Sequence, residues 1–337
     1  MKIGIIGDIH FNEYSSILRE RGEYFSVRLE NCIKSINWAE EVTADCDQIV
    51  YLGDFFDSSS LNAEELTALS YIEWNDRYHR FLVGNHEMGI NNLIFSSAHV
   101  FDKPLGKMEV VSQAYLSYYD EGTELCFLPY ILEEDRQPLA AYFPTRQPGV
   151  SRIIFSHNDL AGIQMGQFLS KAGFTLDEIE ENCDYFFNGH LHNGVRVTNK
   201  ILNVGNLTGQ NFSEDGFKYT HNIFVLDTDT MSYVVLRNPY AINFYKLDSL
   251  DSLQHVVNGA ITLKVDESEV AKANELIKNN PEIVASRVIV NYSRAEKRDV
   301  KELSVDHLDE FRKFVHEKFK DDPQLDLVRE ELEYIYG

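Results

Sequence analysis

Cysteine is scarce in this sequence and shows no pairing pattern. The 337 residues include four cysteines, Cys32, Cys46, Cys126 and Cys183, which are scattered and form no Cys-x-x-Cys pair. This spacing argues against a disulfide-stabilised secreted domain. We therefore expect buried thiols in a reduced, cytoplasmic protein.

Long apolar segments are also missing. The apolar opening, residues 1–7, is short and charged residues follow it closely, so we expect no secretory signal. No apolar run approaches the roughly 18 residues that a membrane span needs, and no membrane association is expected. Hydrophobic residues still make up 44% of the chain, enough for a sizeable core. At about 150 residues per domain, the length predicts two domains, or one large domain with an appendage.

Basic residues are too few to balance the acidic ones. The chain has 31 lysines and arginines against 54 aspartates and glutamates, a formal net charge of −23. Such a surface repels phosphate backbones, so strong unaided binding of nucleic acid is not expected. A nucleic-acid-processing site is not excluded, because bound cations neutralise the carboxylates that hold them.

The order of apolar segments predicts an α/β fold with helices outside the sheets. Strands are expected at residues 2–6, 48–52, 80–83, 152–156 and 185–188, with helices at 25–44 and 63–75 and helical segments before the last two strands. A run of antiparallel strands follows at 194–198, 222–227, 233–236 and 243–247. The chain then changes character, with a strand at 260–265, a helix at 267–278, a strand at 286–292 and closing helices at 305–319 and 325–336.

Five short polar clusters each follow an expected strand. They are Gly7-Asp8-Ile9-His10, Gly53-Asp54-Phe55-Phe56-Asp57, Gly84-Asn85-His86-Glu87, Ser156-His157-Asn158 and Gly189-His190-Leu191-His192. Side chains at strand ends of an α/β sheet converge at its edge, where ligands bind. A lone Asp-x-His pair is weak evidence for a metal site, but chance is a poor explanation for all five in this order.

The donors in these clusters suit a pair of metal ions. Carboxylate, amide and imidazole groups favour Mn²⁺, Fe or Zn²⁺ over Ca²⁺. Two metals about 3.5–4 Å apart need one shared carboxylate and several private ligands. The inventory fits this need, with Asp8, His10 and His192 on one metal, Asn85, His157 and His190 on the other, and Asp54 bridging.

The ordered set D-x-H, G-D-x-x-D, G-N-H-E, H and G-H-x-H resembles the signature of the calcineurin-like metallophosphoesterase superfamily. Within it, the chain is similar to the SbcD-type nuclease subunit of double-strand-break repair complexes and to its phage recombination counterpart. The resemblance implies a β-sandwich flanked by helices at 1–240. It also implies a small α+β capping domain at 241–300 and a C-terminal helical hairpin at 301–337.

The same resemblance implies a function. The chain would be a Mn²⁺-dependent phosphodiesterase with two metal ions, acting as a DNA exonuclease and endonuclease in repair or recombination. Its partners would be DNA, an SMC-like ATPase of the SbcC type, and a second copy in a homodimer. The alternative is a phosphatase or phosphodiesterase of the same fold with a small-molecule or phosphoprotein substrate. A scaffold without activity is disfavoured by the complete ligand set.

Three further residues receive roles near the metals. His86, next to Asn85, is assigned to the leaving oxygen as general acid or charge stabiliser, with Glu87 orienting its imidazole. A third metal ligand or a buried spectator is the alternative for His86. Asp57 is expected to hold a ligand histidine or its loop. Structural or surface roles are expected for the histidines outside the clusters, His79, His99, His221, His255, His307 and His316.

The two C-terminal helices each carry an apolar stripe on a charged surface. The residues are Leu308, Phe311, Val315 and Phe319 in the first, and Leu325, Val328, Leu332 and Ile335 in the second. One interpretation is that the stripes pack on each other or on the core. The other, implied by the resemblance, is that they dock on the coiled-coil base of the ATPase.

Removal of the residues after Ser304 tests the docking interpretation. We expect the truncated chain to keep manganese-dependent hydrolysis of a small diester and to lose co-purification with the ATPase, because the helices would serve the partner alone. Precipitation of the truncated chain, or loss of its metal-dependent turnover, would show that the helices belong to the core.

Overall fold

The computed structural model describes residues 1–102, 106–120, 122–165 and 168–291, so the C-terminal helices expected at 301–337 lie outside the described residues. Two six-stranded sheets dominate the described part. The first has the order β18-β17-β1-β2-β3-β6, with β18 Ser232–Arg237, β17 Asn222–Asp227, β1 Lys2–Ile6, β2 Gln48–Tyr51, β3 Tyr78–Leu82 and β6 Met108–Val111. The second has the order β15-β16-β14-β9-β8-β7, with β15 Val195–Arg196, β16 Ile201–Asn203, β14 Tyr185–Asn188, β9 Ser151–Ser156, β8 Thr123–Leu128 and β7 Tyr115–Asp120.

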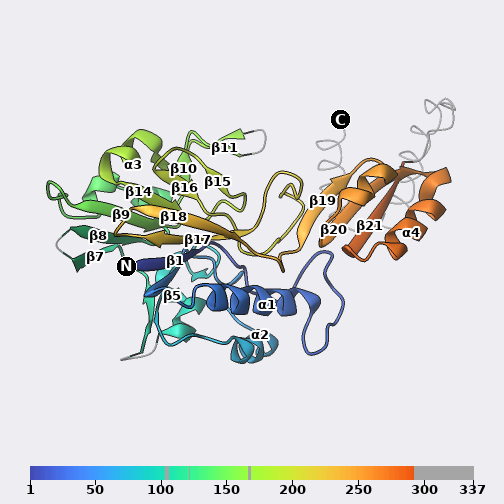
Figure 1. Ribbon diagram of the computed structural model, residues 1–337, viewed down its shortest axis with the longest axis horizontal. Helices are drawn as coiled ribbons and strands as arrows, with labels where there is room; N and C mark the ends of the chain where they lie inside the picture. The colour runs from blue at the N-terminus through green and yellow to red at the C-terminus, as the bar shows by residue number, and fades with distance from the viewer. Residues whose placement is uncertain (103–105, 121, 166–167, 292–337) are drawn as a thin grey trace, which may run out of the picture. The chain divides into compact units, whose positions relative to one another are not determined.

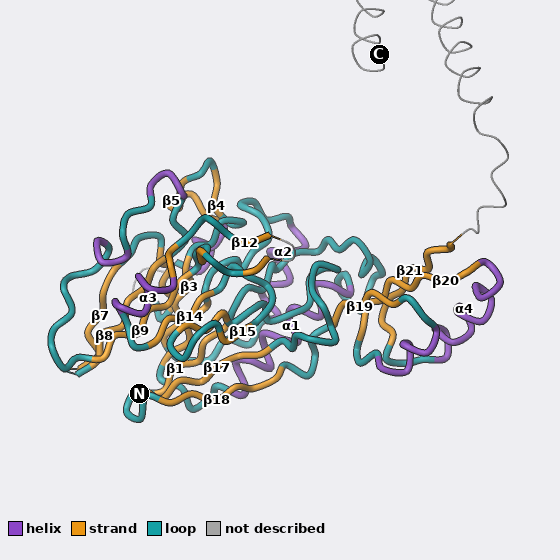
Figure 2. The backbone as a smooth tube through the Cα atoms, turned by 90° about the horizontal axis from the view of Figure 1, so that it is seen from above, coloured by secondary structure: helices purple, strands orange, loops and turns teal. Residues whose placement is uncertain are grey.

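The two sheets stack face to face with helices outside. One buried cluster joins Ile5 and Leu82 of the first sheet to Phe127, Phe155 and Phe187 of the second. Helices α1 (Val27–Val42) and α2 (Ala63–Ala68) lie on one side of the stacked sheets and α3 (Leu176–Asn182) on the other (Figure 1). Strands β1, β17 and β18 run side by side (Figure 2). The predicted α/β sandwich flanked by helices is confirmed.

The helices begin where the sequence provides caps. The Ser26 side chain accepts a hydrogen bond from the Leu29 backbone N–H and starts α1. Asn62 and Glu65 form a reciprocal capping box at the start of α2. Helix α2 ends at Ala68 and continues only as the 3₁₀ turn η1 (Leu69–Tyr71), so the helix predicted over 63–75 is too long. The chain becomes extended at Ile72, whose side chain is buried in the core beneath α1.

Several strands were not predicted. These are β6, β7, β8, β16, the hairpin β4 (Met88–Gly89) and β5 (Asn92–Ser96), and the short strands β10 (Leu160–Ala161), β11 (Gln164–Met165), β12 (Phe168–Leu169) and β13 (Phe174–Thr175). All six residues of β8 are buried, so its sequence lacks the alternation that marks a half-exposed strand. Before β9, where a helical segment was expected, the chain has only the 3₁₀ turns η3 (Glu133–Asp135) and η4 (Leu139–Ala141).

After the sandwich, the chain forms a small α+β module with its own sheet, β19 (Asn243–Leu247), β20 (Gly259–Asp266) and β21 (Ile283–Asn291). Helix α4 (Val270–Asn279) packs on it through Ala273, within a separate hydrophobic cluster. β19 pairs with β20 in parallel, so its predicted place in an antiparallel run was wrong. Turn η5 (Leu250–His255) lies in the crossover that a parallel pair requires. The boundaries of a capping domain at 241–300 stay a prediction.

The pairing of parallel strands aligns the ends that carry the polar clusters. In the first sheet, Ile6 pairs with Tyr51 and Tyr51 with Phe81. In the second sheet, Ser156 pairs with Asn188. The loops after β1, β2 and β3 therefore leave one sheet edge together, as do those after β9 and β14. Across residues 1–291, apart from the short gaps, no helix has the length and apolar character to cross a bilayer.

Candidate metal centre

The structure brings all seven predicted ligands together in two groups. Ligand atoms of Asp8, His10 and His192 lie within 4.8 Å of one another, and so do those of Asp54, His157 and His190. The seventh, Asn85, places its Oδ1 atom 3.0 Å from Nδ1 of His190 and 3.2 Å from Nε2 of His157. Each group combines side chains from both sheets, so the site exists only when the sandwich is closed.

Asp54 lies between the two groups. Its Oδ2 atom is 3.1 Å from Nε2 of His157 in one group and 3.8 Å from Nε2 of His10 in the other. Its Oδ1 atom accepts a hydrogen bond from the backbone N–H of His86 at 2.9 Å, which fixes the carboxylate in this orientation. This placement suits the bridging role assigned to Asp54.

The backbone is strained at three of the predicted ligands. His10, Asp54 and His190 have φ angles of 49°, 48° and 72°, a region that non-glycine residues rarely adopt. Such residues persist only where the surrounding structure imposes them, and they concentrate at functional sites. Gly84 lets its backbone lie directly against Asp54, because a Cβ atom at position 84 would collide with Oδ1 of Asp54.

Two of the four histidines are held by hydrogen-bond acceptors in the loop after β2 of the first sheet. The Nδ1–H group of His10 donates to Oδ1 of Asp57 at 2.8 Å. The Nδ1–H group of His157 donates to the Leu52 carbonyl at 2.7 Å. Because these acceptors engage the Nδ1 atoms, the Nε2 atom of each ring points into the site. Metal-binding histidines are typically held through their other nitrogen in this way.

The other two histidines are held by carboxylates that the sequence analysis missed. Nε2–H of His190 donates to Oδ1 of Asp159 at 3.1 Å, leaving Nδ1 to face Asn85. Nδ1 of His192 lies 3.6 Å from Oε1 of the buried Glu214. Asp159 directly follows the fourth cluster and could have been recognised by that position. Glu214 is far from any cluster in sequence and only the fold brings it near.

The Asp8 carboxylate shows that the residues fit a metal. One oxygen, Oδ1, accepts a hydrogen bond from the His190 backbone N–H at 3.0 Å. The other, Oδ2, is buried and has no hydrogen-bond partner among the described residues. An unpaired buried carboxylate oxygen is costly. Nε2 of His10 also lies only 3.1 Å from Nε2 of His192, an arrangement that a shared cation would satisfy.

The pKa values of Asp54 and His157 show that this site favours positive charge beside its buried carboxylates. Burial alone would raise the pKa of Asp54, but the charge and hydrogen bond of His157, with the charge of His10, hold it well below its usual range. Burial alone would lower the pKa of His157, but the charge and hydrogen bond of Asp54 raise it to about 9. A proton on His157 therefore offsets part of the charge that a metal would balance.

His86 stands at the solvent side of the site, with its side chain 43% exposed. Its ring lies edge-on to that of His10, with centroids 4.6 Å apart, and its Nδ1 atom is 3.6 Å from Oδ1 of Asp57. Glu87, in contrast, is buried and accepts hydrogen bonds from the backbone N–H groups of Phe56 and Gly84. The predicted contact of Glu87 with the His86 ring is therefore wrong. Asp57 is the carboxylate that lies beside the His86 ring.

Glu87 joins two ligand-bearing loops. Its hydrogen bonds connect the loop after β2, which carries Asp54, to the loop after β3, which carries Asn85. Burial, together with the charge of Asp54, raises the pKa of Glu87 to about 8. These contacts make Glu87 a residue that positions the two loops.

Arg28 is a further residue that sequence reasoning missed. This helix α1 side chain is almost fully buried and donates to the carbonyls of Ile9, His10 and Gly209 and to the hydroxyl of Thr208. It therefore fixes the loop that carries His10 against the loop after β16. Helix periodicity alone gives no reason to expect a buried arginine, which is rare unless partnered.

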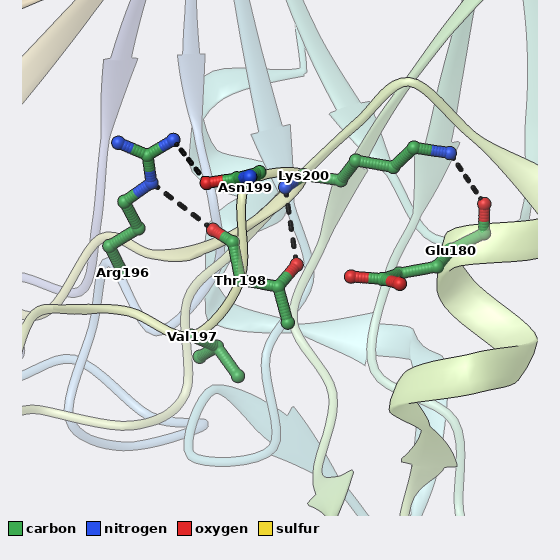
Figure 3. A pocket seen from close by; sticks show the side chains of 6 residues that line it. All are labelled: Glu180, Arg196, Val197, Thr198, Asn199 and Lys200. Atoms are coloured by element: carbon green, nitrogen blue, oxygen red, sulfur yellow. Dashed lines mark hydrogen bonds between the residues drawn. The ribbon is translucent and has the colours of Figure 1, made fainter.

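A separate surface cavity contains none of the predicted ligands. It is lined by Glu180, Arg196, Val197, Thr198, Asn199 and Lys200 (Figure 3). The Arg196 guanidinium donates to the Thr198 carbonyl and to the Asn199 side chain, and the Lys200 ammonium donates to the Glu180 and Cys183 carbonyls. Both cations are thus occupied by the chain itself.

Comparison with known proteins gives a family match. The family model described as calcineurin-like phosphoesterase matches residues 1–194, more than half of the chain. No curated protein matches the sequence. A solved structure of an archaeal phosphodiesterase is similar at 16% identity and a TM-score of 0.36, covering 70% of this chain and 99% of its own. A similarity of that degree carries no argument about function.

Replacement of Asp54 by asparagine tests the bridging position. We expect Asp54→Asn to weaken binding at both sites and to abolish activity, because one lost charge affects two cations at once. Calorimetric titration with Mn²⁺ measures this, with the exposed Asp251→Asn as the matched control. Two intact binding events in Asp54→Asn would contradict the assignment.

Proposed function

The chain belongs to the calcineurin-like phosphoesterase family, and from that premise we propose that it is a phosphodiesterase with two metal ions that cleaves DNA as an exonuclease and endonuclease. One observation carries the proposal. The ligand atoms of two groups converge at the strand ends of both sheets, with the Asp54 carboxylate between them. A shared carboxylate flanked by private ligands is the arrangement that two-metal hydrolysis requires.

The side chains divide between the two ions. Asp8, His10 and His192 would hold one, Asn85, His157 and His190 the other, and Asp54 both. When bound, two such ions polarise a phosphodiester and supply hydroxide near neutral pH. The mixture of oxygen and imidazole donors is compatible with Mn²⁺, which we propose as the metal.

The chain's own residues handle the leaving group. His86 is exposed beside His10, so its imidazole is placed to reach an oxygen of a bound diester. We assign it to donate a proton, or at least positive charge, to the oxygen that departs from phosphorus. Asp57 holds His10 through one hydrogen bond and lies close enough to His86 to orient its ring.

The proposal of DNA as substrate rests on two features. The order and spacing of the clusters resemble the SbcD-type nucleases. In addition, the α+β module of β19, β20, α4 and β21 follows the 194 residues that the family model matches. The net charge of −23 opposes unaided DNA binding. We therefore propose that an SMC-like ATPase supplies the DNA-binding surface and that the nuclease forms a homodimer.

The four cysteines are compatible with a reducing compartment. All of them are buried and free in the structure. Disulfides are rare in the cytosol, where thiols are kept reduced. We propose a cytoplasmic location on this ground.

A direct assay tests the proposed function. The protein is incubated with Mn²⁺ and either linear duplex DNA or bis-p-nitrophenyl phosphate, with a chelator as control. We expect metal-dependent cleavage of both. Hydrolysis of the chromogenic diester alone would favour a phosphoesterase with a small-molecule or phosphoprotein substrate. Hydrolysis of neither would contradict the proposal as a whole.

The role of His86 is tested with His86→Ser. We expect intact Mn²⁺ binding and a turnover of DNA lower by about 10²–10⁴-fold, the scale of one acid–base group. The loss should be smaller with bis-p-nitrophenyl phosphate, because nitrophenolate departs without needing a proton. The exposed His255→Ser serves as the control. Loss of metal from His86→Ser would instead identify His86 as a ligand.

A further inference from the structure

A cavity beside the metal centre is not used by the mechanism above. We propose that it binds a nucleobase of the DNA strand next to the cleaved phosphate, stacked on Tyr130. The substrate strand must then be unpaired at that nucleotide. This inference rests on the proposed nuclease function and adds to it a subsite for one base.

The cavity has the size and position for such a subsite. Its volume is about 350 Å³, within the range of roughly 300–1,000 Å³ seen for small-molecule sites. The β4–β5 hairpin forms one wall, with Met88, Leu93 and Ile94, and the segment from Tyr130 to Asp135 contributes another. The hairpin begins directly after the cluster that contains Asn85 and His86, so this wall of the cavity adjoins a predicted ligand in the sequence.

Tyr130 connects the cavity to the metal ligands. Its ring centroid lies 5.7 Å from that of His190 and 6.3 Å from that of His157. Its backbone N–H donates to the Val83 carbonyl, and the next N–H, of Ile131, donates to Oδ1 of Asn158. The tyrosine is thus fixed between the third and fourth clusters. A base stacked on it would lie beside a phosphate held at the metals.

The chemistry of the walls favours a heterocycle over a phosphate group. The lining contains an aromatic ring, apolar side chains, the amides of Asn91, Asn92 and Gln113, and one carboxylate, Asp135. It contains no lysine or arginine, which a phosphate subsite would require. Aromatic rings stack on bases of any sequence, and amide and carboxylate groups hydrogen-bond to base edges.

The tip of the hairpin supports this interpretation. Ile90 and Asn91 have φ angles of 47° and 52°, the pattern of a type I′ turn. A β-branched residue rarely adopts such a φ, and Ile90 is also 85% exposed. Apolar side chains exposed beside a DNA-processing site are suited to insertion between bases. An apolar tip here would help to keep a base out of its duplex stack and in the cavity.

An abasic scan tests the subsite. Single-stranded oligonucleotides carrying one abasic nucleotide at successive positions are cleaved by the full-length protein with Mn²⁺. We expect kcat/KM to fall by roughly 5- to 100-fold at one position next to the cleaved bond, the scale of one base–aromatic stack. Cleavage with no penalty at any position would overturn the subsite while leaving the nuclease function standing.

Variants of Tyr130 test whether its ring causes the fall in kcat/KM with the abasic substrate. In Tyr130→Ala, the ratio of kcat/KM between the intact and the abasic substrate should fall to about one, whereas Tyr130→Phe should keep the ratio. Any general loss of activity cancels in this ratio. The exposed Tyr118→Ala is the control. An unchanged ratio in Tyr130→Ala would overturn the assignment.

If no oligonucleotide is cleaved while bis-p-nitrophenyl phosphate is hydrolysed, the nuclease proposal itself fails, and the subsite fails with it.

Discussion

Buried negative charge is the constraint on which the rest of the structure depends. Asp8 and Asp54 are almost completely removed from solvent, and buried carboxylates are unstable unless cations or hydrogen-bond donors face them. Around them, the Nε2 atoms of His10 and His157 point inward rather than outward to water. Two divalent cations would balance the carboxylates and coordinate the imidazoles at once.

The fold places a supporting group behind each of the four candidate histidine ligands. Parallel strands of both sheets end at loops whose backbone is held in rare conformations, as at His10 and Asp54. A second ring of groups, including Asp57, Asp159 and Glu214, fixes the imidazoles from outside. Side chains fixed in this way need little reorganisation to hold a metal, which favours both affinity and catalysis.

The convergence of the candidate ligands could be predicted from sequence because each follows a buried strand closely, so local patterns locate it. The supporting residues could not, because tertiary packing alone brings Glu214 to His192 and Arg28 to the His10 loop. Strand β8 was missed for a related reason, since burial on both faces removes its periodicity. The contact of Glu87 was assigned wrongly because neighbours in sequence point in different directions from a turn.

The central claim is that Asp54 joins two metal ions in one centre. Crystals of the protein grown with Mn²⁺, with diffraction recorded at the manganese absorption edge, test it most directly. We predict two anomalous peaks about 3.5–4 Å apart, with Asp54 between them and with Asp8, His10 and His192 on one and Asn85, His157 and His190 on the other. A single peak, or two peaks that do not share Asp54, would contradict the claim.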